Sequence, residues 1–343
     1  MKNQYPLGKL PPEHLARLFE RYTPPDQRVI LGPGIGHDAA VIAFCEAETG
    51  ATGRYLVVKT DPITFASDEI GWYAVHVNAN DIACTGATAR WFLATLLLPQ
   101  ARTDEALVDE IFAQIAHACR QLNIALVGGH TEITHGLDRP VLAGFMLGEV
   151  DTGALVRPDG ARPGDVLLLT KGIAVEGTAI IAREKGDELD AVDRSLVARG
   201  REFLHKPGIS VVQDAAVATA AGDVHAMHDP TEGGLATGLL EMAQAGGVGL
   251  IVDEAAIPIL PETAALCEVL ALDPLGLIAS GALLLAVAPV DADYIRAALE
   301  AEEIATACIG RVVARERGVV LRSGDVERPL PRFERDEIAR LFE

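Results

Sequence analysis

The chain has 343 residues, which exceeds the usual size of one domain and fits two domains of about 150 to 170 residues each. Its 49 acidic and 29 basic residues give a formal net charge of -20. Because no Lys and Arg cluster is interleaved with aromatic residues, the sequence argues against binding to nucleic acid or an anionic membrane. An anionic substrate would therefore need metal ions or local backbone N–H groups.

Helical and strand patterns alternate along the chain. A short amphipathic helix is predicted at residues 11–22, and further helical patterns lie at residues 68–85, 103–122, 176–184 and 232–245. Apolar runs of strand length lie at residues 55–58, 91–98, 124–127, 141–150, 166–170, 249–252 and 282–287. This mixture predicts an α/β or α+β fold.

Residues 151–165 are rich in Gly, Pro and charged residues. They show no hydrophobic periodicity, and the next predicted apolar strand follows directly. We place a domain boundary there, which gives domains at residues 1–152 and 153–343. Residues 1–22 contain no apolar run like that of a signal peptide, and the uncharged segment 274–290 is too short and too interrupted to span a bilayer. We expect a cytoplasmic protein.

The cysteines indicate reduced, mostly structural thiols. They form no C-x-x-C pair and have no histidine at zinc spacing. Five are present, far apart along the chain: Cys45, Cys84, Cys119, Cys267 and Cys308.

Five acidic residues lie in apolar or glycine-rich surroundings, each near a predicted strand end or helix start. They are Asp38, Asp61, Asp81, Glu132 and Asp229. An isolated ionised carboxylate costs several kcal/mol to remove from water unless it is paired or binds a metal. Because their neighbours offer few cations, we expect a dissolved cation to complete the set, namely Mg²⁺ carrying a phosphorylated ligand.

Asp81 belongs to the helix predicted at residues 68–85, for which Ser67 is a suitable N-cap. At 3.6 residues per turn, Asp81 lies almost in line with Ile70 on the apolar stripe, and Asn78 shares that face. Asp81 therefore points inward, either as a ligand or as a carboxylate tied to backbone amides or an arginine.

Asp61 and Asp38 stand where ligand-facing groups are common. Asp61 follows a predicted strand, although an aspartate before a proline is also a plain turn residue. Asp38 follows a loop that contains Gly34 and Gly36. These glycines either permit close backbone approach to phosphate oxygens or simply form a flexible turn.

Residues 128–132 are predicted to form a similar loop after the strand at 124–127. Small residues, Gly128 and Gly129, precede His130, Thr131 and Glu132. His130 either hydrogen-bonds a phosphate or satisfies the loop.

Residues 227–235 form the most distinctive motif of the sequence. Asp229 as N-cap, Pro230 at N1 and Glu232 at N3 predict a helix start without any function. That reading does not require Gly233 and Gly234, each of which costs up to about 1 kcal/mol relative to Ala within a helix. These glycines let another group approach closely, and a helix N-terminus attracts phosphate.

Lys171 and Gly172 follow the first strand of the predicted second domain and resemble another anion-binding corner, although Lys171 is equally consistent with an ordinary surface lysine. No P-loop, no G-x-S-x-G elbow and no protein-kinase signature set occurs in the sequence. A nucleotide site would therefore be of an unusual type.

Together these motifs resemble those of the aminoimidazole-ribonucleotide (AIR) synthase superfamily, also called PurM-like. Residues 36–41 (G-H-D-A-A-V) resemble its G-D-D-A-A-V, residues 59–61 (K-T-D) its T-T-D, and residues 77–83 (V-N-A-N-D-I-A) its V-N-x-x-D-[IL]-A. Residues 171–177, 228–234 and 273–275 are most similar to the branch of the hydrogenase maturation factor HypE.

The resemblance implies an N-terminal mixed sheet that pairs with its twin in a homodimer, and an α/β C-terminal domain. It implies ATP with Mg²⁺ held at the positions of Asp38, Asp61, Asp81, Glu132 and Asp229, with Asp81 and Asp61 as the catalytic candidates. The positions implied to contact the nucleotide are Gly34, Gly36, Lys59, Asn78, Gly128, Gly129, His130, Thr131, Lys171, Gly172, Gly233 and Gly234.

Members of this family phosphorylate an oxygen or selenide of a small acceptor, and in the synthase and HypE branches an activated amide oxygen then leaves as phosphate. Two alternatives stay open: a small-metabolite kinase like thiamine-monophosphate kinase, and a non-catalytic ATP-binding partner in a hydrogenase maturation complex. The sequence departs from the family in two places. His37 replaces the first of two paired aspartates, and the Pro-Arg-[Ile/Val]-Cys tail of HypE is replaced by residues 331–343 without a terminal thiol.

Overall fold

The computed structural model describes residues 10–23, 25–44, 53–63, 68–189 and 192–341. The chain divides into two compact units. The N-terminal unit comprises Asp26–Gly32 and Asp38–Leu155, and the C-terminal unit comprises Met1–Pro25, Pro33–His37 and Val156–Glu343. The domain boundary proposed from the sequence, between residues 152 and 153, stays a prediction.

The N-terminal unit is built on a mixed sheet with the strand order β1-β2-β3-β6-β4-β5. Its strands are β1 (Val29–Leu31), β2 (Ala40–Ala43), β3 (Arg54–Ile63), β4 (Thr88–Pro99), β5 (Ala125–Thr134) and β6 (Val141–Asp151). Strands β4 and β5 are parallel and are connected through helix α3 (Glu105–Gln121), whereas the other neighbours are antiparallel. This is the mixed sheet expected for the first domain.

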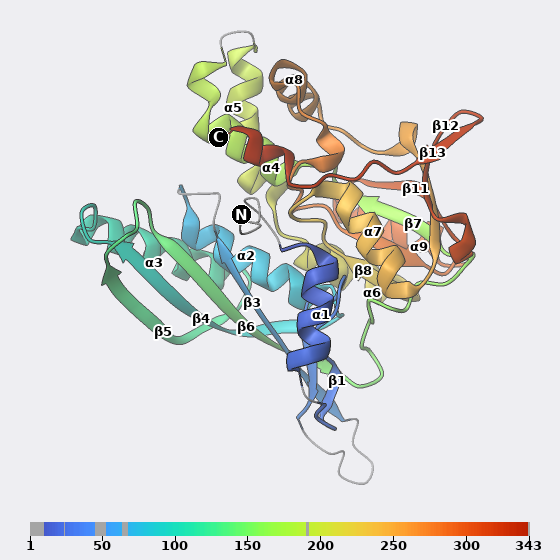
Figure 1. Ribbon diagram of the computed structural model, residues 1–343, viewed down its shortest axis with the longest axis horizontal. Coiled ribbons are helices and arrows are strands. Elements are labelled where there is room, and N and C mark those ends of the chain that lie inside the picture. Colours follow the sequence, from blue (N-terminus) through green and yellow to red (C-terminus); the bar gives the residue numbers. More distant parts are fainter. Residues whose placement is uncertain (1–9, 24, 45–52, 64–67, 190–191, 342–343) are drawn as a thin grey trace, which may run out of the picture. The chain divides into compact units, whose positions relative to one another are not determined.

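Helix α2 (Ile70–Ala83) packs across β3, β4 and β6, and α3 packs beside it (Figure 1). Every residue of α2 is buried, as expected of a helix that is apolar nearly all round. Two glycines of β6 allow this close packing. A Cβ on Gly144 would collide with the amide of Asn78, and a Cβ on Gly148 would collide with Ile82.

The C-terminal unit is built on a second mixed sheet with the strand order β13-β12-β9-β11-β7-β10-β8. Its strands are β7 (Val166–Thr170), β8 (Val224–His228), β9 (Gly249–Asp253), β10 (Leu284–Val287), β11 (Thr306–Val313), β12 (Val319–Ser323) and β13 (Val326–Pro329). Its α-helices are α1 (Pro12–Tyr22), α4 (Val175–Glu184), α5 (Arg194–Glu202), α6 (Val212–Ala221), α7 (Gly234–Gly246), α8 (Pro261–Leu270) and α9 (Ala292–Ala301).

The core of the C-terminal unit lies between α7 and the middle strands of the sheet. Leu235, Leu239 and Met242 of α7 pack with Leu167 of β7 and Leu284 of β10, and all five are buried. Burying each such side chain contributes roughly 1.5–3 kcal/mol, so this layer fixes the start of α7 relative to the strand ends. Within the described part of the chain, no helix has the length and apolar character needed to cross a membrane.

The predicted fold class is confirmed, and the strand predicted at residues 166–170 coincides with β7. Three local predictions were wrong. Asp61, expected to follow its strand, lies inside β3, because the pairing with β6 continues to Ile63. The residues expected to form a loop at 128–132 continue β5, because Gly128 and Gly129 keep the chain extended at positive φ values. The cap predicted at Asp229 is absent, since α7 begins at Gly234 with Gly233 at the N-cap position, and both glycines have positive φ. Ser67, the predicted cap of α2, lies outside the described residues.

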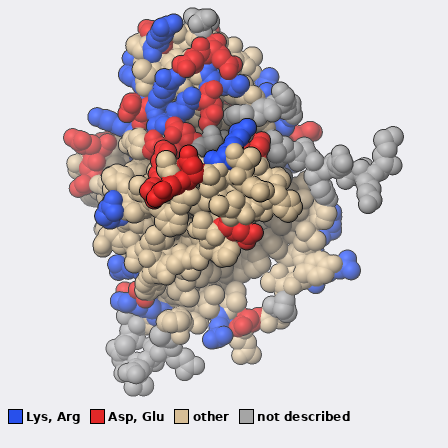
Figure 2. All heavy atoms as spheres, turned by 90° about the vertical axis from the view of Figure 1, so that its left-hand side faces the viewer, with Lys and Arg blue, Asp and Glu red and all other residues tan. Residues whose placement is uncertain are grey.

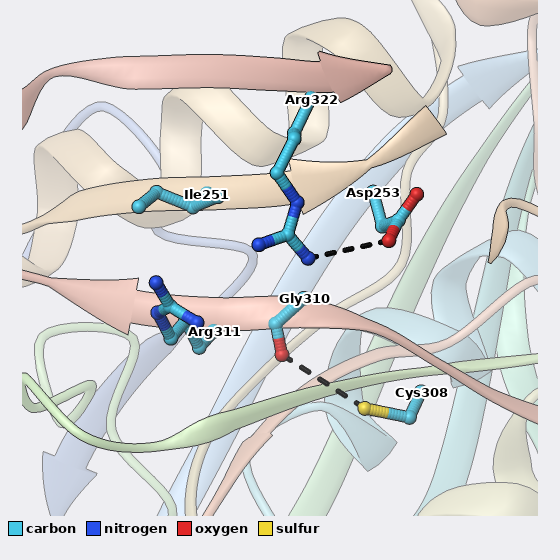
Figure 3. A pocket seen from close by; sticks show the side chains of 6 residues that line it. All are labelled: Ile251, Asp253, Cys308, Gly310, Arg311 and Arg322. Atoms are coloured by element: carbon cyan, nitrogen blue, oxygen red, sulfur yellow. Dashed lines mark hydrogen bonds and ion pairs between the residues drawn. The ribbon is translucent and has the colours of Figure 1, made fainter. Parts of the chain in front are cut away.

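The buried cysteines behave as structural thiols. Burial raises the pKa of Cys119 to about 11 and that of Cys267 to about 12, so both stay protonated at neutral pH. Cys84 is also buried, whereas Cys45 lies outside the described residues. Cys308 is exposed and lines a pocket of about 240 Å³ on the second sheet, where Arg322 and Asp253 form an ion pair (Figure 3).

Candidate functional site

A charged cluster lies where β3 passes beneath α2. The ammonium group of Lys59 is 3.1 Å from Asp61 Oδ2 and 3.2 Å from Asp81 Oδ2. Lys59 and Asp61 are two residues apart on β3, and their partners on β6, Met146 and Gly144, are buried on the side that α2 covers. Asp81, near the end of α2, is only 4% exposed.

Lys59 corrects the expectation that these carboxylates have few cations nearby. Burial by itself lowers the pKa of Lys59, but the negative charges of Asp81, Asp61 and Asp38 outweigh it and raise the pKa above its ordinary value. Lys59 is therefore a fixed cation among three carboxylates. A family motif drew attention to this lysine in the sequence, but its pairing with Asp81 was missed.

The donor set fits a divalent cation. Among these four side chains, three carboxylates face one ammonium, which is an excess of two negative charges. Carboxylate oxygens are the ligands that Mg²⁺ prefers, and Mg²⁺ is commonly held by one or two carboxylates together with substrate phosphates. Asp38, Asp61 and Asp81 are therefore the carboxylates of the Lys59 cluster that could hold a metal, and their role as ligands stays a prediction.

Asn78 fixes the geometry of this cluster. Its side-chain oxygen accepts the N–H of Asp61 at 2.9 Å, and its side-chain nitrogen donates to the carbonyl oxygens of Asp61 at 3.2 Å and Ala74 at 2.8 Å. The side chain is fully buried and ties α2 to the strand just where the two aspartates stand. This is a positioning role, and the nucleotide contact expected of Asn78 stays a prediction.

Glu132 and His130 lie elsewhere on the N-terminal unit. On β5 they pair with Leu97 and Thr95, whose neighbours Leu96 and Leu98 are buried on the opposite side of the strand. Glu132 is exposed, and its carboxylate is 3.4 Å from His130 Nε2. Within this unit Glu132 is thus not brought to the Lys59 cluster, and its role as a metal ligand stays a prediction.

The glycines and the threonine of β5 have positions set by strand pairing. A Cβ on Gly129 would overlap the carbonyl oxygen of Ala94 in β4, so no larger residue fits there. Gly128 has a positive φ, and Thr131 is exposed. The nucleotide contacts expected of these three residues stay predictions.

In the C-terminal unit, Asp229 directly follows β8 and is 1% exposed. Its neighbour His228 is held by α7, with Nε2 3.0 Å from Glu241 Oε2. The N–H groups of the two glycines are used within the chain: Gly233 donates to Asp336, and Gly234 donates to the carbonyl oxygen of Thr231. A phosphate contact with these amides would require a rearrangement of the loop, and it stays a prediction.

Lys171 is engaged inside the C-terminal unit. Its ammonium group is 2.9 Å from Asp214 and 2.5 Å from the carbonyl oxygen of Ser210. Thr170 donates to the same aspartate at 2.7 Å. These contacts support a structural role for Lys171, so the phosphate contacts expected of Lys171 and Gly172 stay predictions.

The glycines of the segment Pro33–His37 also have packing roles. Gly36 has a φ of 75°, and a Cβ there would lie 2.7 Å from the carbonyl oxygen of Glu241 in α7. A Cβ on Gly34 would lie 2.6 Å from the ring of His37. Both positions require glycine for local packing, and their approach to a phosphate stays a prediction.

Family models match most of the chain. The model described as AIR synthase related protein, N-terminal domain, covers residues 36–150, and the corresponding C-terminal domain model covers residues 162–322. The chain belongs to the AIR synthase-related family. The family proposed from the motifs is confirmed, and with it the prediction that the chain is an enzyme of this superfamily.

Relatives of this AIR synthase-related chain include hydrogenase maturation proteins. Carbamoyl dehydratase HypE of Cupriavidus necator is 33% identical over 84% of this chain and 78% of its own length. A HypE–HypF complex contains a chain with a TM-score of 0.74 at 21% identity, over 93% of this chain and 99% of that one. HypE in complex with ATP aligns with a TM-score of 0.68 at 24% identity, over 94% and 96%.

The AIR synthase-related chain also buries an acid that sequence reasoning missed, Glu176 in the first turn of α4. Burial raises the pKa of Glu176 to about 7, partly opposed by hydrogen bonding with Ser280. The signal was present, since residues 173–182 are apolar or small around this single acid. The same criterion that selected Asp81 would have selected Glu176.

Glu176→Gln is expected to remove a pH dependence of stability. A pKa raised from 4.5 to about 7 in the folded state stabilises the fold below pH 4.5, and this stabilisation is lost as pH rises through 7. Because glutamine stays neutral, the variant should match the wild type at pH 4.5 and exceed it at pH 8 by up to about 3 kcal/mol. Urea denaturation at several pH values measures this difference. The exposed control Glu202→Gln should leave the profile unchanged, and parallel profiles for wild type and Glu176→Gln would refute the prediction.

Proposed function

We propose that the chain is a Mg²⁺-dependent, ATP-using enzyme that phosphorylates an amide- or carbonyl-like oxygen of its acceptor. The observation that carries the proposal is the Lys59 cluster, which holds Asp61 and Asp81 within 3.2 Å of one ammonium and leaves an excess of negative charge. Family membership supports it, as do the carbamoyl dehydratase name of the C. necator relative and the ATP complex of HypE.

Asp38, Asp61 and Asp81 would hold the metal in the N-terminal unit, and Asp229 is a further proposed ligand. Glu132 stays a prediction, since the unit does not bring it to this cluster. Mg²⁺, when bound, would neutralise charge on the phosphate oxygens of ATP. The chain's own contribution is preorganisation. Asn78 fixes the strand to the helix, and Lys59 holds two carboxylates in place before any ligand arrives.

The transfer itself needs an acceptor oxygen in line with the terminal phosphate of ATP. The acceptor oxygen forms the new bond to phosphorus as the bond to ADP breaks. In a dehydrating reaction the phosphorylated oxygen then leaves as phosphate while the acceptor nitrogen gives up its protons. We propose an acceptor of the carbamoyl class, since the relatives carry that name.

Calorimetric titration with Mg²⁺ and a non-hydrolysable ATP analogue tests the nucleotide site, and ADP release with a series of acceptors tests the reaction. Binding that requires Mg²⁺, followed by ADP release with a carbamoyl acceptor, is the expected result. ADP release that depends on thiamine monophosphate would favour the small-metabolite kinase. Binding without turnover for any acceptor would favour a non-catalytic partner in a maturation complex.

We also propose that the N-terminal unit pairs with a second copy of the chain. The sheet face turned away from α2 carries Val58, Leu93, Phe145 and Leu147, which line a pocket of about 480 Å³. Figure 2 shows a wide area with few charged side chains on the side where β5 lies. Apolar patches of this kind usually mark an interaction surface. A hydrogenase maturation partner is proposed in addition, on the basis of the HypE–HypF complex, and a cytoplasmic location stays a prediction.

Phe145→Asp is expected to convert the dimer into a monomer. Phe145 is 41% exposed, so a charge there leaves the fold intact but places a carboxylate in the proposed interface. Light scattering at micromolar concentration measures the mass. The control Tyr294→Asp changes a 70% exposed aromatic residue of α9 and should leave the dimer unchanged. A wild type that is monomeric at this concentration would contradict the proposed pairing.

A further inference from the structure

The end of the described chain packs tightly on the C-terminal unit. Leu330 belongs to the core, and Phe333 packs against it. A Cβ on Gly276 would lie 2.5 Å from the ring of Phe333, so the ring closes over a position that has no side chain. Ile338 and Ala339 are buried as well. We name residues 330–341 the C-terminal segment.

Asp336 is the polar centre of the C-terminal segment. It is 1% exposed, and its carboxylate accepts three backbone N–H groups: Gly233 at 2.6 Å, Ile278 at 3.2 Å and Ile338 at 2.8 Å. Burial raises the pKa of Asp336 to about 6, while these three donors act in the opposite direction. At neutral pH a buried, mostly ionised carboxylate therefore links three segments that are far apart in the sequence.

One of these segments is the loop Asp229–Gly234. Its first residue is fixed by the end of β8, and its last residues adopt left-handed conformations, with φ values of 84° at Gly233 and 64° at Gly234. Gly233 is held by Asp336 through a short, charge-assisted hydrogen bond. Asp229 thus lies at the first anchored end of this short loop, and the second end, at Gly233, depends on the C-terminal segment.

We propose that Asp336 is a positioning residue for the loop Asp229–Gly234 and that the C-terminal segment thereby sets the affinity of the chain for Mg²⁺-nucleotide. The inference rests on the proposed function, in which Asp229 helps to hold the metal. Asp336 acts through the loop and does not touch the ligand. Its role is to keep Gly233 in the left-handed conformation that places Asp229.

Asp336→Asn removes one contact selectively. The amide oxygen replaces Oδ1 and keeps the N–H groups of Ile278 and Ile338, whereas the amide nitrogen faces the N–H of Gly233 as a second donor. The expected result is that Mg²⁺-dependent binding of the non-hydrolysable ATP analogue weakens at least about tenfold, the equivalent of one charge-assisted hydrogen bond.

The matched control is Arg340→Ala in the same segment. Arg340 contacts Glu337 at 2.7 Å and the carbonyl oxygen of Ala271 at 3.1 Å, and neither contact involves the loop. It should bind the analogue like the wild type. Equal affinities for wild type and Asp336→Asn would overturn the inference alone, whereas a wild type that binds no analogue would overturn the proposed function and the inference with it.

Hydrogen exchange of the Gly233 amide tests the contact with Asp336 without any ligand, and the wild type alone already gives an informative result. The amide should exchange slowly in the wild type and in Arg340→Ala, and its proton resonance should move upfield in Asp336→Asn. A Gly233 amide that exchanges as fast as an exposed amide in the wild type would overturn the inference, because the anchoring contact would be absent.

Discussion

Lys59→Met is expected to lower the free energy of unfolding of the metal-free chain by about 3–5 kcal/mol, the usual cost of removing one partner of a buried ion pair. Methionine keeps much of the aliphatic packing but removes the ammonium group that Asp38, Asp61 and Asp81 share. Their mutual repulsion in a partly dehydrated site then opposes folding. Millimolar Mg²⁺ should recover part of the loss, because a bound divalent ion supplies the missing charge.

Urea denaturation with EDTA and with Mg²⁺ measures both effects. Arg54→Met on the same strand is the matched control. It removes a positive charge from exposed ion pairs with Asp151 and Glu149, and the loss of such surface pairs costs about 0–1 kcal/mol. A Lys59→Met chain as stable as Arg54→Met would show that the carboxylates do not depend on this lysine. Equal stability of Lys59→Met with EDTA and with Mg²⁺ would argue against a metal at these carboxylates.

Asp81→Asn is expected to abolish Mg²⁺-dependent nucleotide binding, with at least about a 100-fold loss of affinity, or ~2.7 kcal/mol. The substitution removes one proposed ligand and one charge while keeping the shape of the side chain. From the sequence alone, losing an isolated buried charge predicts a metal-free chain that is as stable as the wild type or slightly more so. Lys59 reverses that expectation, because Asp81 is its partner at 3.2 Å.

The metal-free Asp81→Asn chain should therefore lose stability, by about 1–3 kcal/mol. This is less than for Lys59→Met, since the lysine keeps Asp61 at 3.1 Å. Calorimetry gives the affinity and thermal unfolding gives the stability. Asp151→Asn, an exposed aspartate of the same sheet, should change neither. Unaltered nucleotide affinity with a large fall in melting temperature would make Asp81 purely structural.

The sequence predicted the family and the fold class because motifs in a fixed order and apolar periodicity are local signals. Asp81 could be placed on an inward face from the spacing to Ile70, and α2 is indeed buried throughout. The partner of Asp81 could not be placed, because the contact with Lys59 depends on how β3 and α2 pack. Likewise, nothing in the sequence links Gly233 to Asp336, which lies 103 residues further along the chain.

Glycine caused two of the errors in local structure. A helix start at Asp229 is favoured by the side chains of Pro230 and Glu232, yet two glycines with positive φ and the hydrogen bond from Ala279 to Thr231 delay the helix until Gly234. In β5 the sequence predicts that the strand ends before its glycines, whereas Gly129 pairs so closely with Ala94 that only glycine fits inside the strand there. In both places tertiary packing overrides the local pattern.

The two glycines of β6 that contact α2 influence the electrostatic interactions between the helix and the sheet, because they determine how closely the two pack. Gly144 and Gly148 present only hydrogen atoms to the helix, so α2 packs closer to the sheet than a side chain at either position would permit. The reach from Lys59 to Asp81 depends on that close packing, because one residue belongs to the sheet and the other to the helix. The strength of the ion pair between Lys59 and Asp81 thus depends on uncharged positions. A methyl group added at Gly144 or Gly148 would weaken this ion pair without changing any of the charged residues.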